Sequence, residues 1–290
     1  MLRAFVLALF LTWIAPMREA QAYCFSTACK DGSGESCDGA ELEPGCVPLR
    51  WKSGCVGFSV QRDGAPSIPA KEIDMLVRSA FSAWAGLDCG GAEGPGFLVQ
   101  DLGEVTCDRV EYNSDAGNAN VIMVRETAWS HPPSEGHNIA LTTTTFDPDT
   151  GELLDADMEI NAADFHLTTN DTQVDYDLSS VLTHEAGHFL GLAHSTDPTA
   201  TMRPTYDTGN IELRQPILDD AMAICAVYPS SRKLDASCNP LPRHGFSPEC
   251  KGAQTEGSCS AASSPRGGWG GLLLVVGVAI ASARRRCVER

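Results

Sequence analysis

One short stretch constrains this chain more than any other: residues 184–194 read His-Glu-Ala-Gly-His-Phe-Leu-Gly-Leu-Ala-His. His184 and His188 are four residues apart, and two such side chains lie one above the other on the same face of an α-helix. Both imidazoles can then reach a single ion at roughly 2.0 to 2.1 Å. Gly191 suits a helix end, because glycine enters the left-handed conformation without a side-chain clash. We therefore predict a helix, a reversal at Gly191, and the return of His194 to the same ion.

This spacing indicates a catalytic zinc site. Three neutral imidazoles leave one coordination position open for water, which distinguishes a catalytic zinc site from a closed structural one. Zinc lowers the pKa of such a water to about 7. Glu185, next to the first histidine, is placed to accept the proton of that water as a general base. The alternative is a buried helix whose histidines bind no metal, and the fixed offsets of five such residues argue against it.

The residues around the motif resemble the matrixin branch of the metzincin zinc endopeptidases. Ser195 directly follows the third histidine, as in matrixins. The resemblance places Met202 at the Met-turn, a tight turn whose methionine packs beneath the zinc. It places Pro204 and Tyr206 where the matrixin chain lines the pocket for the substrate side chain just after the cut bond. Residues 219–229, Asp-Asp-Ala-Met-Ala-Ile-Cys-Ala-Val-Tyr-Pro, resemble the closing helix of the family.

For residues 48–229 the resemblance implies an α+β fold, a zincin-like catalytic domain in which a twisted mixed β-sheet packs with helices. Apolar periodicity predicts a helix at 69–85, with Pro69 at its first position. Before the motif helix, Asp175 and Asp177 are placed to cap its first turn. We expect strands at residues 49–60, 97–102, 121–124, 139–146 and 153–161.

Residues 139–146 and 153–161 read as two strands joined by a turn. By the resemblance, the first of them is the edge strand of the sheet. Leu141, Thr142 and Thr143 would then offer unpaired backbone groups to an extended peptide, so we expect proteins or peptides as substrates. The other interpretation of residues 142–145, four threonines, is a β-branched edge that hydroxyl groups keep soluble.

The chain departs from the family at these strands. Animal matrixins have histidines there for a second, structural zinc, whereas this sequence has Thr144 and Asp157, so we do not predict that site. His131 and His137 lie in the loop upstream, and we interpret them as solvent-exposed loop histidines.

Three carboxylates, Asp155, Asp157 and Glu159, alternate along one face of the second strand. Carboxylate oxygens of this kind bind Ca²⁺, which makes calcium one interpretation of the group. The other is that they are exposed carboxylates that need no metal.

The N-terminus indicates export. Residues 1–22 carry Arg3, an apolar run and a final Ala-Gln-Ala, as in a secretory signal peptide. Twelve cysteines in 290 residues agree with an oxidising compartment. Cys89 with Cys107 and Cys238 with Cys250 are plausible local disulfides, although spacing leaves the connectivity open.

Residues 23–47 read as a cysteine-rich N-terminal extension with little core-forming material, held by disulfides. Cys46 has a second interpretation, because Pro44-Gly45-Cys46 is similar to the matrixin latency motif. In that motif a cysteine thiolate fills the open position of the zinc.

Two further segments follow the domain. Residues 230–266, rich in Pro, Ser and Gly and containing cysteines, read as a stalk. Residues 267–290 combine an apolar run, just long enough to span a bilayer, with three consecutive arginines. This layout resembles a C-terminal surface-sorting tail that is removed on delivery to the cell surface. A plain transmembrane anchor is the alternative.

A net charge of −17 would repel phosphate backbones, which argues against nucleic-acid partners. We expect an exported monomer, secreted or at the cell surface, that hydrolyses peptide bonds of extracellular proteins with one catalytic zinc. The alternative is a surface binding module, such as an adhesin, that contains zinc without cutting. Glu185 argues against that alternative, because binding alone needs no base beside the metal.

Overall fold

A computed structural model of the protein describes residues 22–250, apart from 30–31, 38–41, 64, 91–93, 133–137, 233 and 235–237, together with 277–282. The strands are β1 (Cys24–Cys29), β2 (Gly32–Cys37), β3 (Val47–Pro48), β4 (Cys55–Gln61), β5 (Leu98–Val105), β6 (Val121–Arg125), β7 (Ala140–Phe146), β8 (Leu153–Asn161), β9 (Leu167–Thr168), β10 (Tyr176–Asp177) and β11 (Gly277–Ser282). The helices are α1 (Ala70–Ala85), α2 (Leu178–Phe189), the 3₁₀ turn η2 (Glu212–Arg214) and α3 (Leu218–Val227).

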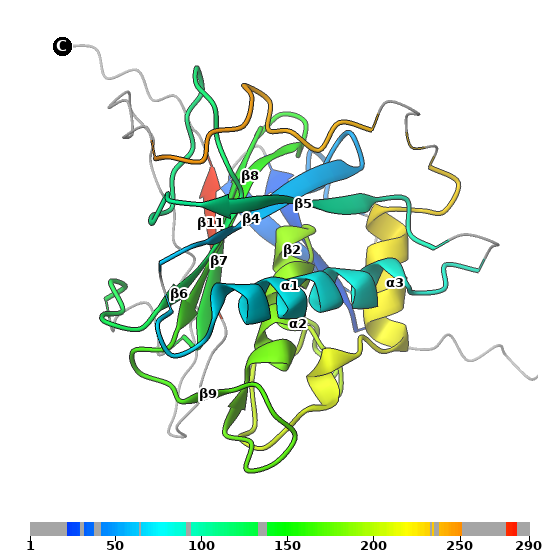
Figure 1. Ribbon diagram of the computed structural model, residues 1–290. Helices are drawn as coiled ribbons and strands as arrows, with labels where there is room; N and C mark the ends of the chain where they lie inside the picture. Colours follow the sequence, from blue (N-terminus) through cyan, green and yellow to red (C-terminus); the bar gives the residue numbers. More distant parts are fainter. Residues whose placement is uncertain are drawn as a thin grey trace, which may run out of the picture.

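The main sheet has six strands in the order β11-β7-β8-β6-β4-β5. Strands β7 and β8 are antiparallel, and every other neighbouring pair is parallel. Helices α1 and α2 pack together and contact this sheet (Figure 1). The predicted α+β architecture, a mixed sheet packed with helices, is confirmed.

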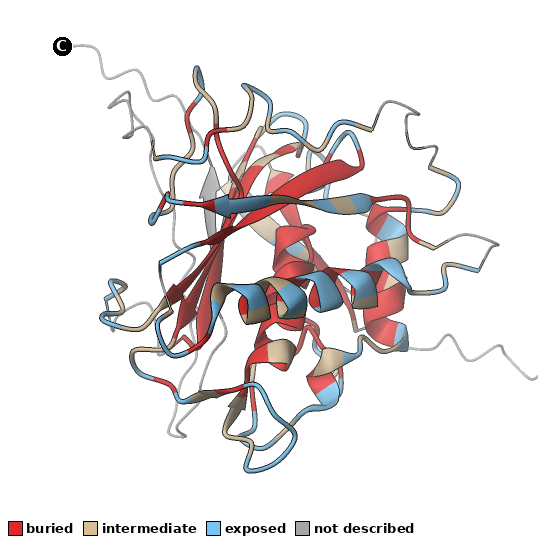
Figure 2. Cartoon of the chain, in the orientation of Figure 1, coloured by how far each residue is buried: buried red, intermediate tan, exposed pale blue. Residues whose placement is uncertain are grey.

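Helix α1 follows Pro69, which occupies the N-cap position, and buries one face against the core. Figure 2 shows the exposed outer side of this helix and the almost continuous burial of α2 behind it. The Trp84 indole N–H donates to the carbonyl of Thr183 over 2.8 Å. Helix α1 therefore supports the middle of α2 directly.

The N-terminal segment contributes to the core, unlike the peripheral extension that we expected. Tyr23 and Phe25 are buried in the main hydrophobic cluster. The backbone N–H of Ser26 donates to Gly191, and that of Ala193 donates to Cys24, so β1 lies along the chain that leaves α2. The segment is closed by disulfides Cys24–Cys37 and Cys29–Cys46. Because Cys46 is disulfide-bonded, the latency interpretation of this residue is wrong.

Both local disulfides suggested by sequence distance are also wrong. The structure pairs Cys55 with Cys238, Cys89 with Cys225 and Cys107 with Cys250. Each of these bonds joins segments more than 130 residues apart in sequence. Spacing along the chain could not reveal them, because the order of strands in the sheet decides which cysteines meet.

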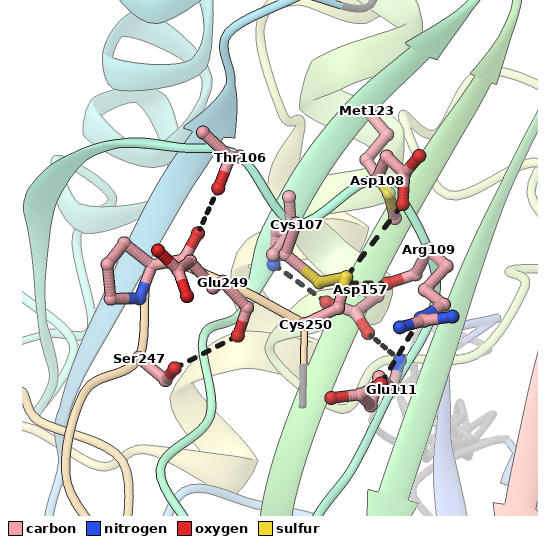
Figure 3. Close-up of a disulfide and its surroundings, with 12 residues drawn as sticks. Thr106, Cys107, Asp108, Arg109, Glu111, Met123, Asp157, Ser247, Glu249 and Cys250 are labelled. Atoms are coloured by element: carbon pink, nitrogen blue, oxygen red, sulfur yellow. Dashed lines mark hydrogen bonds and ion pairs between the residues drawn. A yellow bond between two sulfur atoms is a disulfide. The ribbon is translucent and has the colours of Figure 1, made fainter. Parts of the chain in front are cut away.

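Residues 238–250, which we expected within a stalk, lie against the main body of the fold. Disulfide Cys107–Cys250 ties them to the chain that follows β5 (Figure 3). The backbone N–H of Thr106 donates to Pro248 over 2.8 Å, and that of Ser247 donates to Asn118 over 3.0 Å. A second small hydrophobic cluster, around Val121 and Met123, is packed beneath this cover.

The interpretation of Asp155, Asp157 and Glu159 as exposed carboxylates is wrong, because their residues are only 1%, 0% and 5% exposed. Asp157 accepts a hydrogen bond from the backbone N–H group of Glu111 at 3.0 Å (Figure 3) and one from that of Val121 at 2.7 Å. All three carboxylates are therefore buried, and Asp157 is bonded to the backbone of the 106–120 segment.

Glu159 explains the position of His131, which we expected to be a solvent-exposed loop histidine. The Nε2 atom of His131 lies 2.7 Å from the carboxylate of Glu159, and the His131 side chain is 21% exposed. Burial raises the pKa of Glu159, but hydrogen bonds from His131 and Arg125 outweigh it, so the pKa is lowered overall. His137 lies outside the described residues.

Strand β11 pairs in parallel with β7, with Gly277 opposite Leu141 and Ser282 opposite Phe146. The prediction that β7 forms the free edge of the sheet is therefore wrong, because β11 covers that edge.

Over the described ranges, no helix is long and apolar enough to cross a membrane. Residues 1–21, part of the predicted signal peptide 1–22, and the remainder of 267–290 lie outside the described residues.

Asp155 and Asp157 predict a pH-dependent stability. Burial, followed by the charge of Asp157, raises the pKa of Asp155 well above its usual value, and burial raises the pKa of Asp157 to about 7. In the unfolded chain both groups titrate near pH 4. Their contribution to stability is therefore fully present below about pH 4. It is lost as the pH rises through the folded-state pKa of each group, which is about 7 for Asp157.

Asp155→Asn should reduce this loss, because the amide needs no proton to stay neutral. Urea denaturation at pH 5 and pH 8 should show that the variant gains stability relative to the wild type at the higher pH. The exposed substitution Asp149→Asn is the matched control and should leave the difference unchanged. A constant difference between wild type and Asp155→Asn at both pH values would contradict the assignment.

Candidate metal centre

The motif lies on helix α2 and the turn after it, as predicted. Asp177 is the N-cap, and its carboxylate accepts hydrogen bonds from Ser180 N and Oγ, at 2.8 and 2.7 Å. Gly191 has φ +94°, and a side chain there would collide with the carbonyl of Leu49. The structure thus confirms the capping role of Asp177 and the reversal at Gly191, whereas Asp175 does not cap the helix.

The reversal brings the three histidines together. The Nε2 atoms of His184 and His188 are 3.0 Å apart, and those of His188 and His194 are 3.3 Å apart. Two ligands at roughly 2.0 to 2.1 Å from one tetrahedral zinc ion lie about 3.3 Å from each other. Within the described residues, these three form a group whose ligand atoms all lie within 4.8 Å of one another.

Backbone carbonyls orient two of these rings from behind. The Nδ1 atom of His184 lies 2.6 Å from the carbonyl of Thr201, and that of His188 lies 2.9 Å from the carbonyl of Leu192. A carbonyl can only accept, so each Nδ1 carries the proton and each Nε2 presents a lone pair to the centre. Lone pairs that face one another repel, and a cation bound between them removes that repulsion; this donor set fits zinc.

Burial keeps these imidazoles neutral. It lowers the pKa of His184 to about 3 and that of His188 well below its usual value, and the neighbouring histidines add to both shifts. Neutral imidazole is the form that binds a metal ion. The rings are therefore held in the protonation state and orientation that coordination needs.

Glu185 is completely buried beside this cluster. Its Oε2 accepts a hydrogen bond of 2.5 Å from the hydroxyl of Thr142 on β7. Its Oε1 has no hydrogen-bond partner in the described part of the chain. Burial raises the pKa of Glu185 to about 8, and the hydrogen bond from Thr142 opposes that rise. The Thr142 hydroxyl thus fixes Oε2 of Glu185, whereas Oε1 remains available to accept a proton.

The predicted Met-turn packs against α2. Met202 is buried, and its carbonyl accepts the backbone N–H of Ser195 over 2.8 Å, which closes the loop after His194. A side chain on Gly187 would collide with the sulfur of Met202, so the absence of one gives the methionine its place against the helix. The carboxylate of Asp220 accepts the backbone N–H groups of Thr201 and Met202, at 2.9 and 3.1 Å.

Tyr206 and Pro204 follow the turn. The Tyr206 hydroxyl accepts the N–H of Asp177 over 2.9 Å and donates to the carbonyl of Asn210, whereas Pro204 is exposed. Arg214 forms two hydrogen bonds with the Asp177 carboxylate, at 2.6 and 2.8 Å. The segment after the Met-turn is thus tied to the start of α2.

The sequence analysis did not predict that Asp220, Thr201 and Arg214 support the site. The paired aspartates at the start of α3 could have indicated Asp220, but no sequence pattern indicated Thr201 or Arg214. Thr142 was predicted for its backbone, and its fully buried side chain shows that the solubility interpretation is wrong at this position. Leu141 is also buried, whereas Thr143 is partly exposed.

Comparison with known proteins agrees with this geometry. The sequence model of one protein family, described as matrixin, matches residues 50–229. Human neutrophil collagenase is 28% identical over 199 residues, which cover 66% of this chain and 38% of the relative. Human matrix metalloproteinase-20 is 31% identical over 179 residues, which cover 62% of this chain and 32% of the relative. Pig interstitial collagenase is 29% identical over 192 residues, which cover 65% of this chain and 35% of the relative. The chain thus spans about a third of the length of these relatives.

Asp220→Ala should destabilise the whole site. The substitution leaves the buried N–H groups of Thr201 and Met202, and that of Ile217, without their acceptor. Each unsatisfied group costs about 1 to 3 kcal/mol, so we expect a loss of roughly 3 kcal/mol or more in urea denaturation. Asp74→Ala removes an exposed ion pair with Arg78 and should cost less than about 1 kcal/mol. Equal losses for the two variants would contradict the role of Asp220.

Proposed function

The chain belongs to the matrixin family, and from this premise we propose that it is a zinc-dependent endopeptidase that cuts peptide bonds of extracellular proteins. Matrixins are zinc metallopeptidases that act on proteins. One observation carries the proposal for this chain: three imidazole Nε2 atoms converge beside a buried carboxylate that has one oxygen unengaged within the described residues.

His184, His188 and His194 would hold the zinc through their Nε2 atoms. When bound, zinc supplies polarisation of the scissile carbonyl and lowers the pKa of a water molecule to about 7. Glu185 accepts a proton from the attacking water at Oε1 as the water oxygen bonds to the carbonyl carbon. It then delivers that proton to the amine nitrogen as the C–N bond breaks. Burial of Glu185 excludes bulk water from this transfer.

The substrate backbone would pair with β7 at Leu141, Thr142 and Thr143. Support comes from β11, a segment distant in sequence that already pairs along this strand. A peptide can add to the same backbone groups only when β11 has left them. Pro204 and Tyr206 would border the pocket for the side chain that follows the cut bond.

We further propose that residues 1–22 direct export and that residues 267–290 anchor or sort the protein at the cell surface once β11 has left β7. The five disulfides within the described residues support an oxidising compartment. Calcium is not part of the proposal, because Asp157 and Glu159 accept hydrogen bonds from protein groups.

Glu185→Gln tests the proposed chemistry. The amide keeps the shape of the side chain but cannot accept the proton, so peptide cleavage should fall by about 10² to 10⁴-fold. Metal analysis should still find one zinc per chain, because the three histidines are unchanged. A chelator should abolish wild-type cleavage of casein or gelatin, and His194→Ala should lose both zinc and activity.

If Glu185→Gln cut denatured protein at the wild-type rate, the general-base mechanism would be wrong. A wild-type protein that binds zinc and cuts no peptide would favour the surface binding module instead.

A further inference from the structure

Thr142 points its side chain into the protein. On the antiparallel β7–β8 pair it lies opposite Met158, and both residues are completely or almost completely buried. Its hydroxyl oxygen lies 2.5 Å from Oε2 of Glu185 and 3.4 Å from the carbonyl oxygen of the same residue. Carboxylate and carbonyl oxygens both accept, so the single hydroxyl proton of Thr142 is donated to Glu185, and the shorter contact is to the carboxylate.

This bond controls the direction of a flexible side chain. A hydroxyl-to-carboxylate hydrogen bond of this length belongs to the stronger, charge-assisted class. Thr142 is β-branched and therefore stiff about its first side-chain torsion, whereas Glu185 has three rotatable bonds. Thr142 thus holds the more flexible Glu185 side chain through its Oε2 atom. Oε1 of Glu185 has no hydrogen-bond partner in the described part of the chain.

We propose that Thr142 is a positioning residue for the general base: its hydroxyl holds the Glu185 carboxylate so that Oε1 faces the reacting water. The inference rests on the proposed peptidase function and adds to it a residue whose side chain the motif does not contain. Without the bond, the carboxylate samples orientations in which neither oxygen can take the proton.

The same strand offers a matched control. Thr144 is two residues further along β7, on the same face, and is 2% exposed. Its hydroxyl has no hydrogen-bond partner within the described residues. Replacing either threonine by valine therefore removes one buried hydroxyl from one strand without changing the side-chain shape. Only the change at Thr142 removes a bond to Glu185.

The first test compares the zinc-loaded variants Thr142→Val, Thr142→Ser and Thr144→Val in peptide hydrolysis. Replacing a residue that is hydrogen-bonded to a functional side chain typically lowers activity by about 10 to 100-fold. We expect a decrease of this size in kcat for Thr142→Val. KM and zinc content should stay within about twofold of wild type, because binding groups are unchanged. Thr142→Ser should recover most of the rate, and Thr144→Val should match wild type.

The second test measures thermal stability of the zinc-loaded protein and does not depend on activity. Thr142→Val is made in the wild type and in Glu185→Ala, and the shift in Tm is compared in the two backgrounds. We expect a clear drop in Tm when Glu185 is present and a much smaller one when it is absent. Equal drops in both backgrounds would overturn the inference.

The two tests separate the possible failures. If peptides are cut and Thr142→Val is as fast as Thr144→Val, the role of Thr142 is wrong and the peptidase function stands. A loss of rate that Thr142→Ser does not recover also overturns the inference, since shape and not the hydroxyl would be responsible. If wild type cuts no peptide, the proposed function fails, and with it the role of Thr142 in catalysis.

Discussion

The convergence of three imidazole lone pairs on one point is the constraint on which the rest of this structure depends. Such an arrangement is unfavourable unless a cation neutralises it and unless each ring is prevented from turning away. The carbonyls of Thr201 and Leu192 prevent this for His184 and His188, because each accepts the Nδ1 proton of one ring. The geometry of the metal centre therefore depends on the positions of these two backbone carbonyls.

That backbone is held by segments from both ends of the domain. Leu192 pairs with Phe25 of the N-terminal segment in an isolated β-bridge. Thr201 is held by Asp220 at the start of α3, whose carboxylate also accepts the N–H of Ile217. Phe25 and Asp220 thus help to fix the positions of the Leu192 and Thr201 carbonyls, so the first strand and the last helix of the domain act on the same site.

Helix α2 and its N-cap bury several polar side chains, and such groups need partners in place of water. Asp177, Glu185 and the histidines obtain partners from Arg214, Thr142 and the backbone carbonyls respectively. On the other side of the sheet, Asp157 relies on the backbone of the segment that the Cys107–Cys250 disulfide secures. On each side of the sheet, a buried carboxylate is thus bonded by a neighbouring segment: Asp177 by Arg214, and Asp157 by the backbone near the Cys107–Cys250 disulfide.

What the sequence determined by itself is local. Spacing along the chain encodes helix faces and backbone conformations, so it predicted α1, the position of the three histidines, the cap at Asp177 and the reversal at Gly191. What only the tertiary structure decided is non-local: the partners of Cys107 and Cys46, the burial of Asp155, the pairing of β11 with β7, and the orientation of Thr142 toward Glu185. These features depend on which strands become neighbours and which face of each strand another segment covers. Periodicity within one segment carries no information about the neighbour that segment will meet, because contacts between distant residues are chosen by the packing of the whole chain.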